Sequence, residues 1–119
     1  MKISNIQIGR YLQALNDISE KTSGRLSYAV ARNIRKLSEE YQDYDAEMSK
    51  IVNKYGEPTD GGMVVSPDSE NYKKAVDELM EIGKIEHDVD VFVLPSDDVL
   101  NTNLSAKEIL SIDFMIQES

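Results

Sequence analysis

A single apolar stripe between residues 26 and 55 constrains the fold of this chain more than any other feature. Its members recur at steps of three and four residues, which is the spacing of one helix face and of a coiled-coil seam. They are Leu26, Val30, Ile34, Leu37, Tyr41, Tyr44, Met48, Ile51 and Tyr55. Gly56 can supply the C′ residue and Pro58 follows it, so the pattern predicts a helix over about residues 23–55.

Such a helix is too long for a compact domain made by this chain alone. It would be about 50 Å long at 1.5 Å per residue, whereas a compact chain of this size has a radius of gyration of about 13–14 Å. Another helix or another chain must therefore lie along it. We expect a homo-oligomer, most simply a dimer, to cover the apolar stripe.

The first residues predict a short strand followed by a helix. Met1 to Ile3 can form the strand, and Ser4 with Gln7 three residues later has the pattern of a capping box. Ile3 and Ile8 occupy the two positions of a hydrophobic staple. This helix should end near Ser19, before a turn-forming Thr-Ser-Gly cluster.

The second half of the chain predicts two further helices and one strand. Ser66-Pro67-Asp68 is typical of a helix start. The helix after it should fold back on the long helix through Tyr72, Ala75, Val76, Leu79, Ile82 and Ile85. The alternation over residues 89–94 predicts a strand that Pro95 stops, with residues 1–3 and 63–65 as available partners. Residues 97–103 favour turns with room for one helical turn.

A terminal helix is predicted by the best capping signature in the chain. Ser105 is its N-cap, Glu108 stands at N3, and Leu104 with Ile109 forms the staple. Apolar residues continue to Ile116 on more than one face, which indicates burial in the core or against a partner. Together these elements predict one domain over residues 1–119 with a mainly helical α+β fold: a long central helix, a helix folded back on it, a small sheet and a C-terminal helix.

Charge divides the chain into unequal parts. Residues 1–36 hold seven basic and two acidic side chains, and the rest holds six basic and twenty acidic ones, which leaves a net charge of −9. This polarity can steer association with a partner or, head to tail, with a second copy. The acidic remainder would repel a phosphate backbone, so direct nucleic-acid binding is not expected.

Composition excludes many kinds of chemistry. The chain has no Cys and one His, His87, so it offers no disulfide, no thiolate site and no catalytic triad. Gly61-Gly62 is too short for a phosphate-binding loop. No cofactor is expected, and neither a signal peptide nor a membrane span is indicated. The enzyme alternative is a divalent-metal hydrolase, whose ligands would be Asp88, Asp90, Asp97, Asp98, Glu39 and Glu40.

Two charged surfaces remain as candidates for binding. The basic one has Arg25, Arg32 and Arg35 near the start of the long helix, as anion contacts for a small ligand held at an oligomer interface. The acidic one could imitate nucleic-acid phosphates; it comprises Glu39, Glu40, Asp43, Asp45, Glu47, Asp77, Glu78 and Glu81. Tyr41, Tyr44 and Met48 lie on the stripe between them and complete the predicted partner-binding residues.

Three segments resemble small uncharacterised proteins encoded in phages and prophages of Gram-positive bacteria. The segments are Leu26 to Ile34, Glu86 to Val91, and Leu104 to Leu110 with the following Asp113 to Ile116. In those proteins a long charged helix ends in a turn similar to Lys54-Tyr55-Gly56. The resemblance carries no catalytic motif. It implies a non-enzymatic phage protein in the cytoplasm of a bacterial host, or in the virion, that contacts a phage or host protein. Virion assembly and inhibition of a host defence system remain alternatives.

Overall fold

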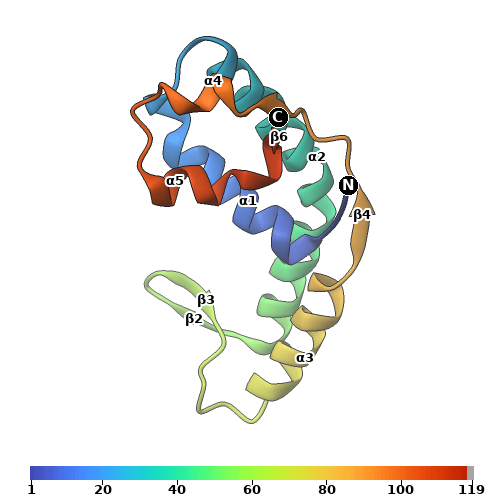
Figure 1. The fold of residues 1–119 in the computed structure, drawn as a ribbon. Helices are drawn as coiled ribbons and strands as arrows, with labels where there is room; N and C mark the ends of the chain where they lie inside the picture. Colours follow the sequence, from blue (N-terminus) through green and yellow to red (C-terminus); the bar gives the residue numbers. More distant parts are fainter. Residues whose placement is uncertain (118–119) are drawn as a thin grey trace.

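The computed structural model describes residues 1–117 as two regions joined by one long helix (Figure 1). Helix α2 (Gly24–Tyr55) runs unbroken through both regions. We call residues 1–38 and 84–117 the head, and residues 39–83 the arm. The molecule extends over 51 × 30 × 21 Å with a radius of gyration of 17.1 Å, well above that of a compact domain of its length.

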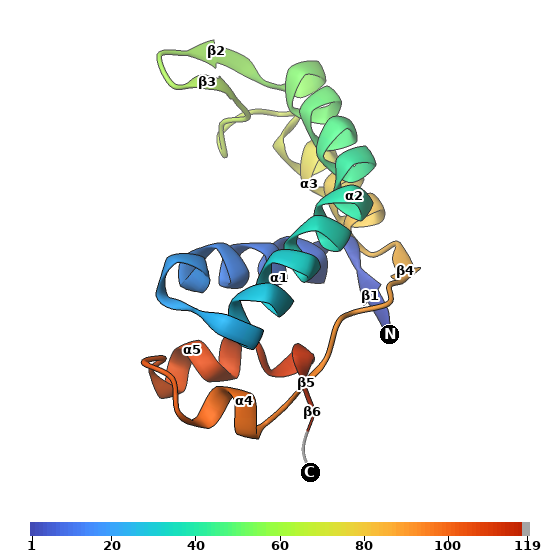
Figure 2. The same cartoon turned by 90° about the horizontal axis from the view of Figure 1, so that it is seen from above.

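The head surrounds the first half of α2 with helices and short strands, as Figure 2 shows from above. Its elements are β1 (Lys2–Ser4), α1 (Asn5–Ile18), η1 (Ser19–Lys21), β4 (Glu86–Asp88), β5 (Leu94–Pro95), α4 (Asp97–Leu100), α5 (Ala106–Ser111), η2 (Asp113–Met115) and β6 (Ile116–Gln117). Fourteen buried side chains form one core cluster, and all of them belong to the head.

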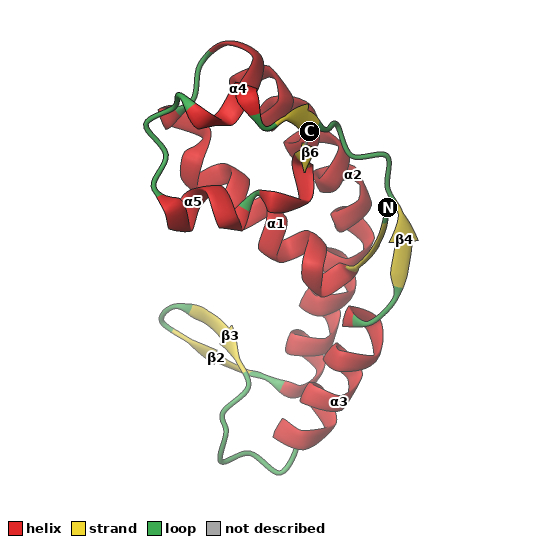
Figure 3. Ribbon diagram, viewed as in Figure 1, coloured by secondary structure: helices red, strands yellow, loops and turns green. Residues whose placement is uncertain are grey.

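The arm consists of the second half of α2, a hairpin and the helix that folds back. The hairpin pairs β2 (Glu57–Thr59) with β3 (Gly62–Val64), and α3 (Tyr72–Gly83) runs beside α2 (Figure 3). Only Ile51 and Ala75 are buried apolar side chains in this region of the described chain. The arm is therefore a thin layer with little core of its own.

The structure confirms the mainly helical α+β fold, with its long helix, the helix folded back on it, small sheets and a C-terminal helix. Both predicted capping boxes are present. Ser4 accepts a hydrogen bond from the Gln7 backbone at 3.2 Å, and Ser105 accepts one from the Glu108 backbone at 3.2 Å. The predicted helical turn after Pro95 is α4. None of the helices formed by residues 1–117 combines the length and the apolar character that a membrane crossing requires.

The strand predicted over residues 89–94 was wrong. The strands flank residues 89–93: β4 ends before them and pairs antiparallel with β1, and β5 begins at Leu94 and pairs parallel with β6. The buried side chain of Asn33 binds both backbone polar groups of Phe92, so a helix side chain takes the place of a strand partner there. Residues 63–65, the other predicted partner, contribute to the local hairpin with β2 instead.

Two helix ends differ from prediction, and a third stands at Gly56 as predicted but with another backbone conformation. Residues 66–71 form turns in which Ser66 and Ser69 accept hydrogen bonds from the backbone two residues ahead, so α3 begins only at Tyr72. The terminal helix stops at Ser111, and η2 and β6 complete the apolar run. Gly56 is extended rather than left-handed; a Cβ there would lie 2.5 Å from the Val52 carbonyl oxygen.

The stripe on α2 is covered in part by this chain itself. Each of its nine members is buried or half-buried, with the head covering one half and α3 with the hairpin covering the other. Another helix thus lies along the second half of α2, which is one of the two predicted ways of covering it, and five of the nine members remain only half-buried. The homo-oligomer itself stays a prediction.

Candidate functional site

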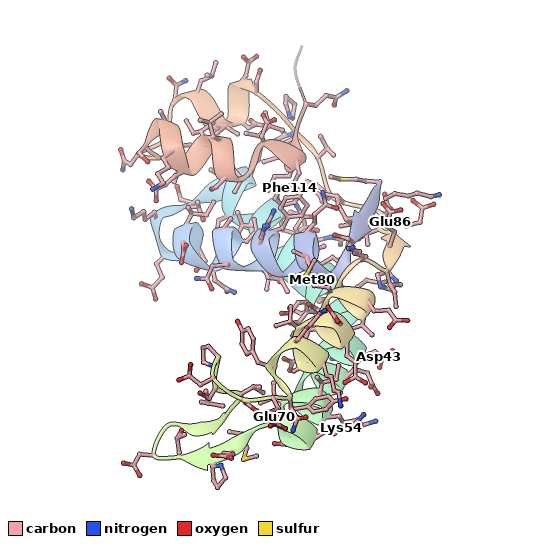
Figure 4. The ribbon with its side chains drawn as sticks, turned by 90° about the horizontal axis from the view of Figure 1, so that it is seen from below. Asp43, Lys54, Glu70, Met80, Glu86 and Phe114 are labelled. Carbon is pink, nitrogen blue, oxygen red and sulfur yellow. The ribbon has the colours of Figure 1, made fainter. Side chains whose placement is uncertain are left out.

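A groove lies where the head meets the arm, between α2, the C-terminal end of α3, β4 and the start of α1. Its volume is about 270 Å³. The lining residues are Asn5, Glu39, Glu40, Asp43, Tyr44, Glu47, Ile82, Ile85 and His87. Figure 4 shows Asp43 on the outer side of α2, beside α3 and away from the hairpin. We call this feature the acidic groove.

One wall of the acidic groove carries four carboxylates from a single face of α2. Glu39, Asp43 and Glu47 are spaced four residues apart, and Glu40 stands beside them. Glu47 pairs with Lys50 at 3.0 Å. Within residues 1–117, no lysine or arginine lies within ion-pair distance of Glu39 or Asp43. The wall thus presents negative charge that the described chain neutralises only in part.

The second wall is held by the buried side chain of Asn5. Its Nδ2 donates to the Ile82 carbonyl at 2.9 Å, so its Oδ1 faces His87 and accepts from Nε2 at 2.9 Å. His87 Nδ1 then points to Glu40 Oε2 at 3.7 Å. The Asn5 backbone also donates to the Ile85 carbonyl at 3.0 Å. These bonds join the start of α1 to the end of α3 and to β4, which fixes the shape of the groove.

The floor of the groove is apolar. Ile82 is half-buried, Ile85 is half exposed, and Tyr44 lies beside them from α2. Tyr44 packs edge to face on Tyr41, with ring centroids 5.4 Å apart. Burial raises the pKa of both phenols, and the negative charges of the Tyr44 phenolate and Asp45 raise the pKa of Tyr41 further, so both groups stay protonated at physiological pH.

The predicted partner-binding residues divide among four places, and the three that are not arginines each lie in a different one. Tyr44 lines the acidic groove. Tyr41 turns toward α1, where its ring lies close to Gly9, which has no side chain. Met48 lines a separate cavity of about 330 Å³, together with Val52 of α2 and Met63 of the hairpin.

The three predicted arginines lie in the head, on the first half of α2. Arg25 pairs with Asp98 at 3.2 Å, Arg32 lies over two aromatic rings, and Arg35 is exposed. The structure thus places them away from the groove and from Met48, so the six residues do not form one site.

The carboxylates considered as metal ligands do not converge. Asp88 meets the Met1 amino group at 3.3 Å, Asp90 meets Lys36 at 3.8 Å, and Asp98 meets Arg25. Among residues 1–117, no group of three His, Asp or Glu side chains is close enough to hold a metal ion.

Sequence reasoning missed the neutral residues of the groove. Asn5, Ile82 and Ile85 come from segments distant in sequence and carry no motif. Ile82 lies on the folded-back helix as predicted, whereas Ile85 lies beyond the end of that helix at Gly83 and is half exposed. Of the eight carboxylates predicted as one acidic surface, four line this wall, and Asp45, Asp77, Glu78 and Glu81 do not.

Comparison with protein-family models gave no match for this chain, and comparison with curated proteins and with solved structures gave none either. The geometry of the groove is therefore the basis for the function proposed below.

Proposed function

We propose that the protein acts without catalysis, by binding another protein, and that the acidic groove receives a basic segment of that partner. The observation that carries this proposal is the combination of four carboxylates with an apolar floor in one cavity of about 270 Å³. Lys and Arg side chains have the matching construction, because an aliphatic stem carries a cation at its end.

The charge of the whole arm supports the same kind of partner. The arm has twelve acidic and four basic side chains, and its net charge of −8 accounts for nearly all of the chain's −9. Such a field accelerates the approach of a basic surface and loses strength as salt screens it. A partner with a basic segment is thus attracted to the arm before it reaches the groove.

Within this class we propose a phage protein, following the resemblance of the three sequence segments described above. A basic segment is common to nucleic-acid-binding proteins, so an inhibitor that occupies such a protein of a host defence system fits the groove. Virion assembly is the alternative. The mass of the captured complex distinguishes them, because an assembly factor is recovered with virion proteins and an inhibitor with a host protein.

The homo-oligomer is a separate proposal, and its surface would lie on α3. Tyr72, Val76 and Met80 follow one flank of α3 at steps of four residues and are 40%, 36% and 43% exposed. A second copy could cover this flank with its own. Light scattering of the purified chain tests this directly: twice the monomer mass supports a dimer, and 13.4 kDa contradicts it.

The experiment for the groove is affinity capture from a lysate of phage-infected cells with two matched variants. Glu39→Gln/Asp43→Asn removes two charges from the groove, and Asp77→Asn/Glu81→Gln removes two from exposed positions on α3. We expect the wild type and the α3 variant to retain the same basic protein, and the groove variant to lose most of it. Equal retention by all three would contradict the groove as the binding surface.

A further inference from the structure

A second cavity lies in the head, beside the first turns of α2. Its volume is about 330 Å³, and it is lined by Gly24, Arg25, Tyr28, Phe92 and Leu94. This size is near the lower end of the roughly 300–1,000 Å³ typical of small-molecule sites, and suits one ring system whose substituents extend to the edge of the cavity. The acidic groove shares none of these residues.

Two aromatic rings form the wall of this cavity. Tyr28 and Phe92 meet edge to face, with centroids 5.8 Å apart and an interplanar angle of 77°. The Arg32 guanidinium carbon lies 5.9 Å from both centroids, so a cation–π contact supports the pair. Tyr28 is 56% exposed and Phe92 is half-buried, which leaves aromatic surface open to a planar ligand.

The position of Phe92 is fixed by the fully buried side chain of Asn33. Asn33 Oδ1 accepts from the Phe92 backbone at 2.7 Å, and Asn33 Nδ2 donates to the Phe92 carbonyl at 2.9 Å. Leu94 follows in β5 and is buried against the core. The aromatic wall is therefore organised before any ligand arrives, which lowers the entropy lost on binding.

Arg25 supplies the cation at the edge of this cavity. Its Nε lies 3.2 Å from Asp98 Oδ2, and its side chain is 74% exposed, so the guanidinium is open to an anion from solvent. Residues 24–38 contain Arg25, Arg32, Arg35 and Lys36 and no acidic residue. This part of the surface is positive although the chain as a whole is acidic.

We propose that this cavity binds a nucleotide, whose base stacks on the face of one ring of the Tyr28–Phe92 wall and meets the other ring at its edge, while its phosphate meets Arg25. Stacking on aromatic side chains tolerates any base, because every base has a π face. The site does not depend on the acidic groove, so its failure would leave the proposed function intact.

The test is titration calorimetry of the full chain with AMP, adenosine and inorganic phosphate at one ionic strength. We expect AMP to bind at least about tenfold more tightly than adenosine or phosphate, because only AMP uses both wall and arginine. Adenosine or phosphate binding as tightly as AMP would overturn the proposal, and so would the absence of AMP binding.

Three variants and one control locate the binding. Phe92→Leu and Arg25→Gln should each weaken AMP by about tenfold, while Asp98→Asn should tighten it because the competing carboxylate is removed from Arg25. Arg10→Gln removes the same charge from an exposed position on α1 and should change nothing.

Circular dichroism and melting temperature confirm that each variant is folded. Arg25 is exposed, so we expect Arg25→Gln to fold. This variant therefore tests the AMP site even if Phe92→Leu does not fold. Unchanged AMP affinity in Arg25→Gln, or weaker affinity in Asp98→Asn, would contradict the site.

Discussion

The head and the arm share one helix and one apolar pattern, yet they bury that pattern to different extents. In the head, Leu26, Val30 and Leu37 are buried among side chains from α1 and the C-terminal segments. In the arm, Tyr44 and Met48 are only half-buried, although they occupy equivalent positions along α2. The difference follows from what packs against α2 in each region. In the head α2 packs against a full layer of elements, and in the arm it packs against one helix and a small hairpin.

This comparison indicates a division of tasks. A region with few buried apolar contacts contributes little to global stability and opens at lower cost than the core. The arm nevertheless carries most of the net charge and forms most of the acidic groove. We interpret the head as the part that keeps the chain folded and the arm as the part that meets a partner.

The largest expected effect comes from removing one stripe side chain in each region. Leu37→Ala should lower the free energy of unfolding by about 3–5 kcal/mol, because the side chain is completely buried. Ile51→Ala should cost about 1–2 kcal/mol, because the thin arm can relax around the gap. Urea denaturation measures both, and equal losses would contradict the contrast between the regions.

The next effect concerns the polar contact inside the head. Asn33→Ala should cost about 2–3 kcal/mol, because it leaves both backbone polar groups of Phe92 without their partner. Asn53→Ala, at an exposed position of the arm, is the matched control and should stay within about 0.5 kcal/mol of the wild type. Similar losses in the two variants would show that Asn33 does not anchor residue 92.

A smaller effect is expected at the junction between the regions. Gly83→Ala would place a Cβ 2.8 Å from the Ile6 side chain and 3.2 Å from the Tyr44 hydroxyl. We expect a loss of about 1–2 kcal/mol and a shift of α3 away from α1. Gly61→Ala meets no atom within 4 Å and serves as control. Chemical shifts of Ile6 that stay unchanged in Gly83→Ala would contradict this close packing.

The smallest effects should appear at opposite ends of the pH scale. Hydrogen bonds from Ser105 and Lys21 lower the pKa of Glu108 in the head, so its contribution holds above the ordinary value of 4.5 and is lost as pH falls through the folded value. Hydrogen bonds with Tyr55 and Glu78 raise the pKa of Lys54 in the arm, so its contribution is lost as pH rises above 10.5. Melting temperature plotted against pH measures both contributions. In Glu108→Gln the plot should flatten at the acidic end only, and in Lys54→Met at the alkaline end only.

The parts that were predictable from sequence are those encoded by local chemistry. The spacing from Leu26 to Tyr55 predicts the long helix to within a few residues of its bounds. The capping pairs at Ser4 and Ser105 predict the starts of two further helices equally well. The errors arose where distant residues decide the outcome. Nothing near residues 89–94 reveals that Asn33 will take the hydrogen bonds of a strand partner.

The candidate sites divide in the same way. The four carboxylates of the groove share one helix face, so their clustering could be read directly from the sequence. The closing wall of Asn5 and His87, and the pairing of Tyr28 with Phe92, depend on contacts across more than sixty residues of chain. Sequence periodicity holds no information about contacts between residues so far apart in the chain.

The continuity of α2 has a consequence for how the two proposed sites work together. No proline or glycine interrupts the helix between Arg25 and Tyr55, and an α-helix without such residues resists sharp bending. The cavity at the first turns of α2 and the groove near its middle are thus held at a fixed separation. A partner that engages both must carry its own contacts at that spacing.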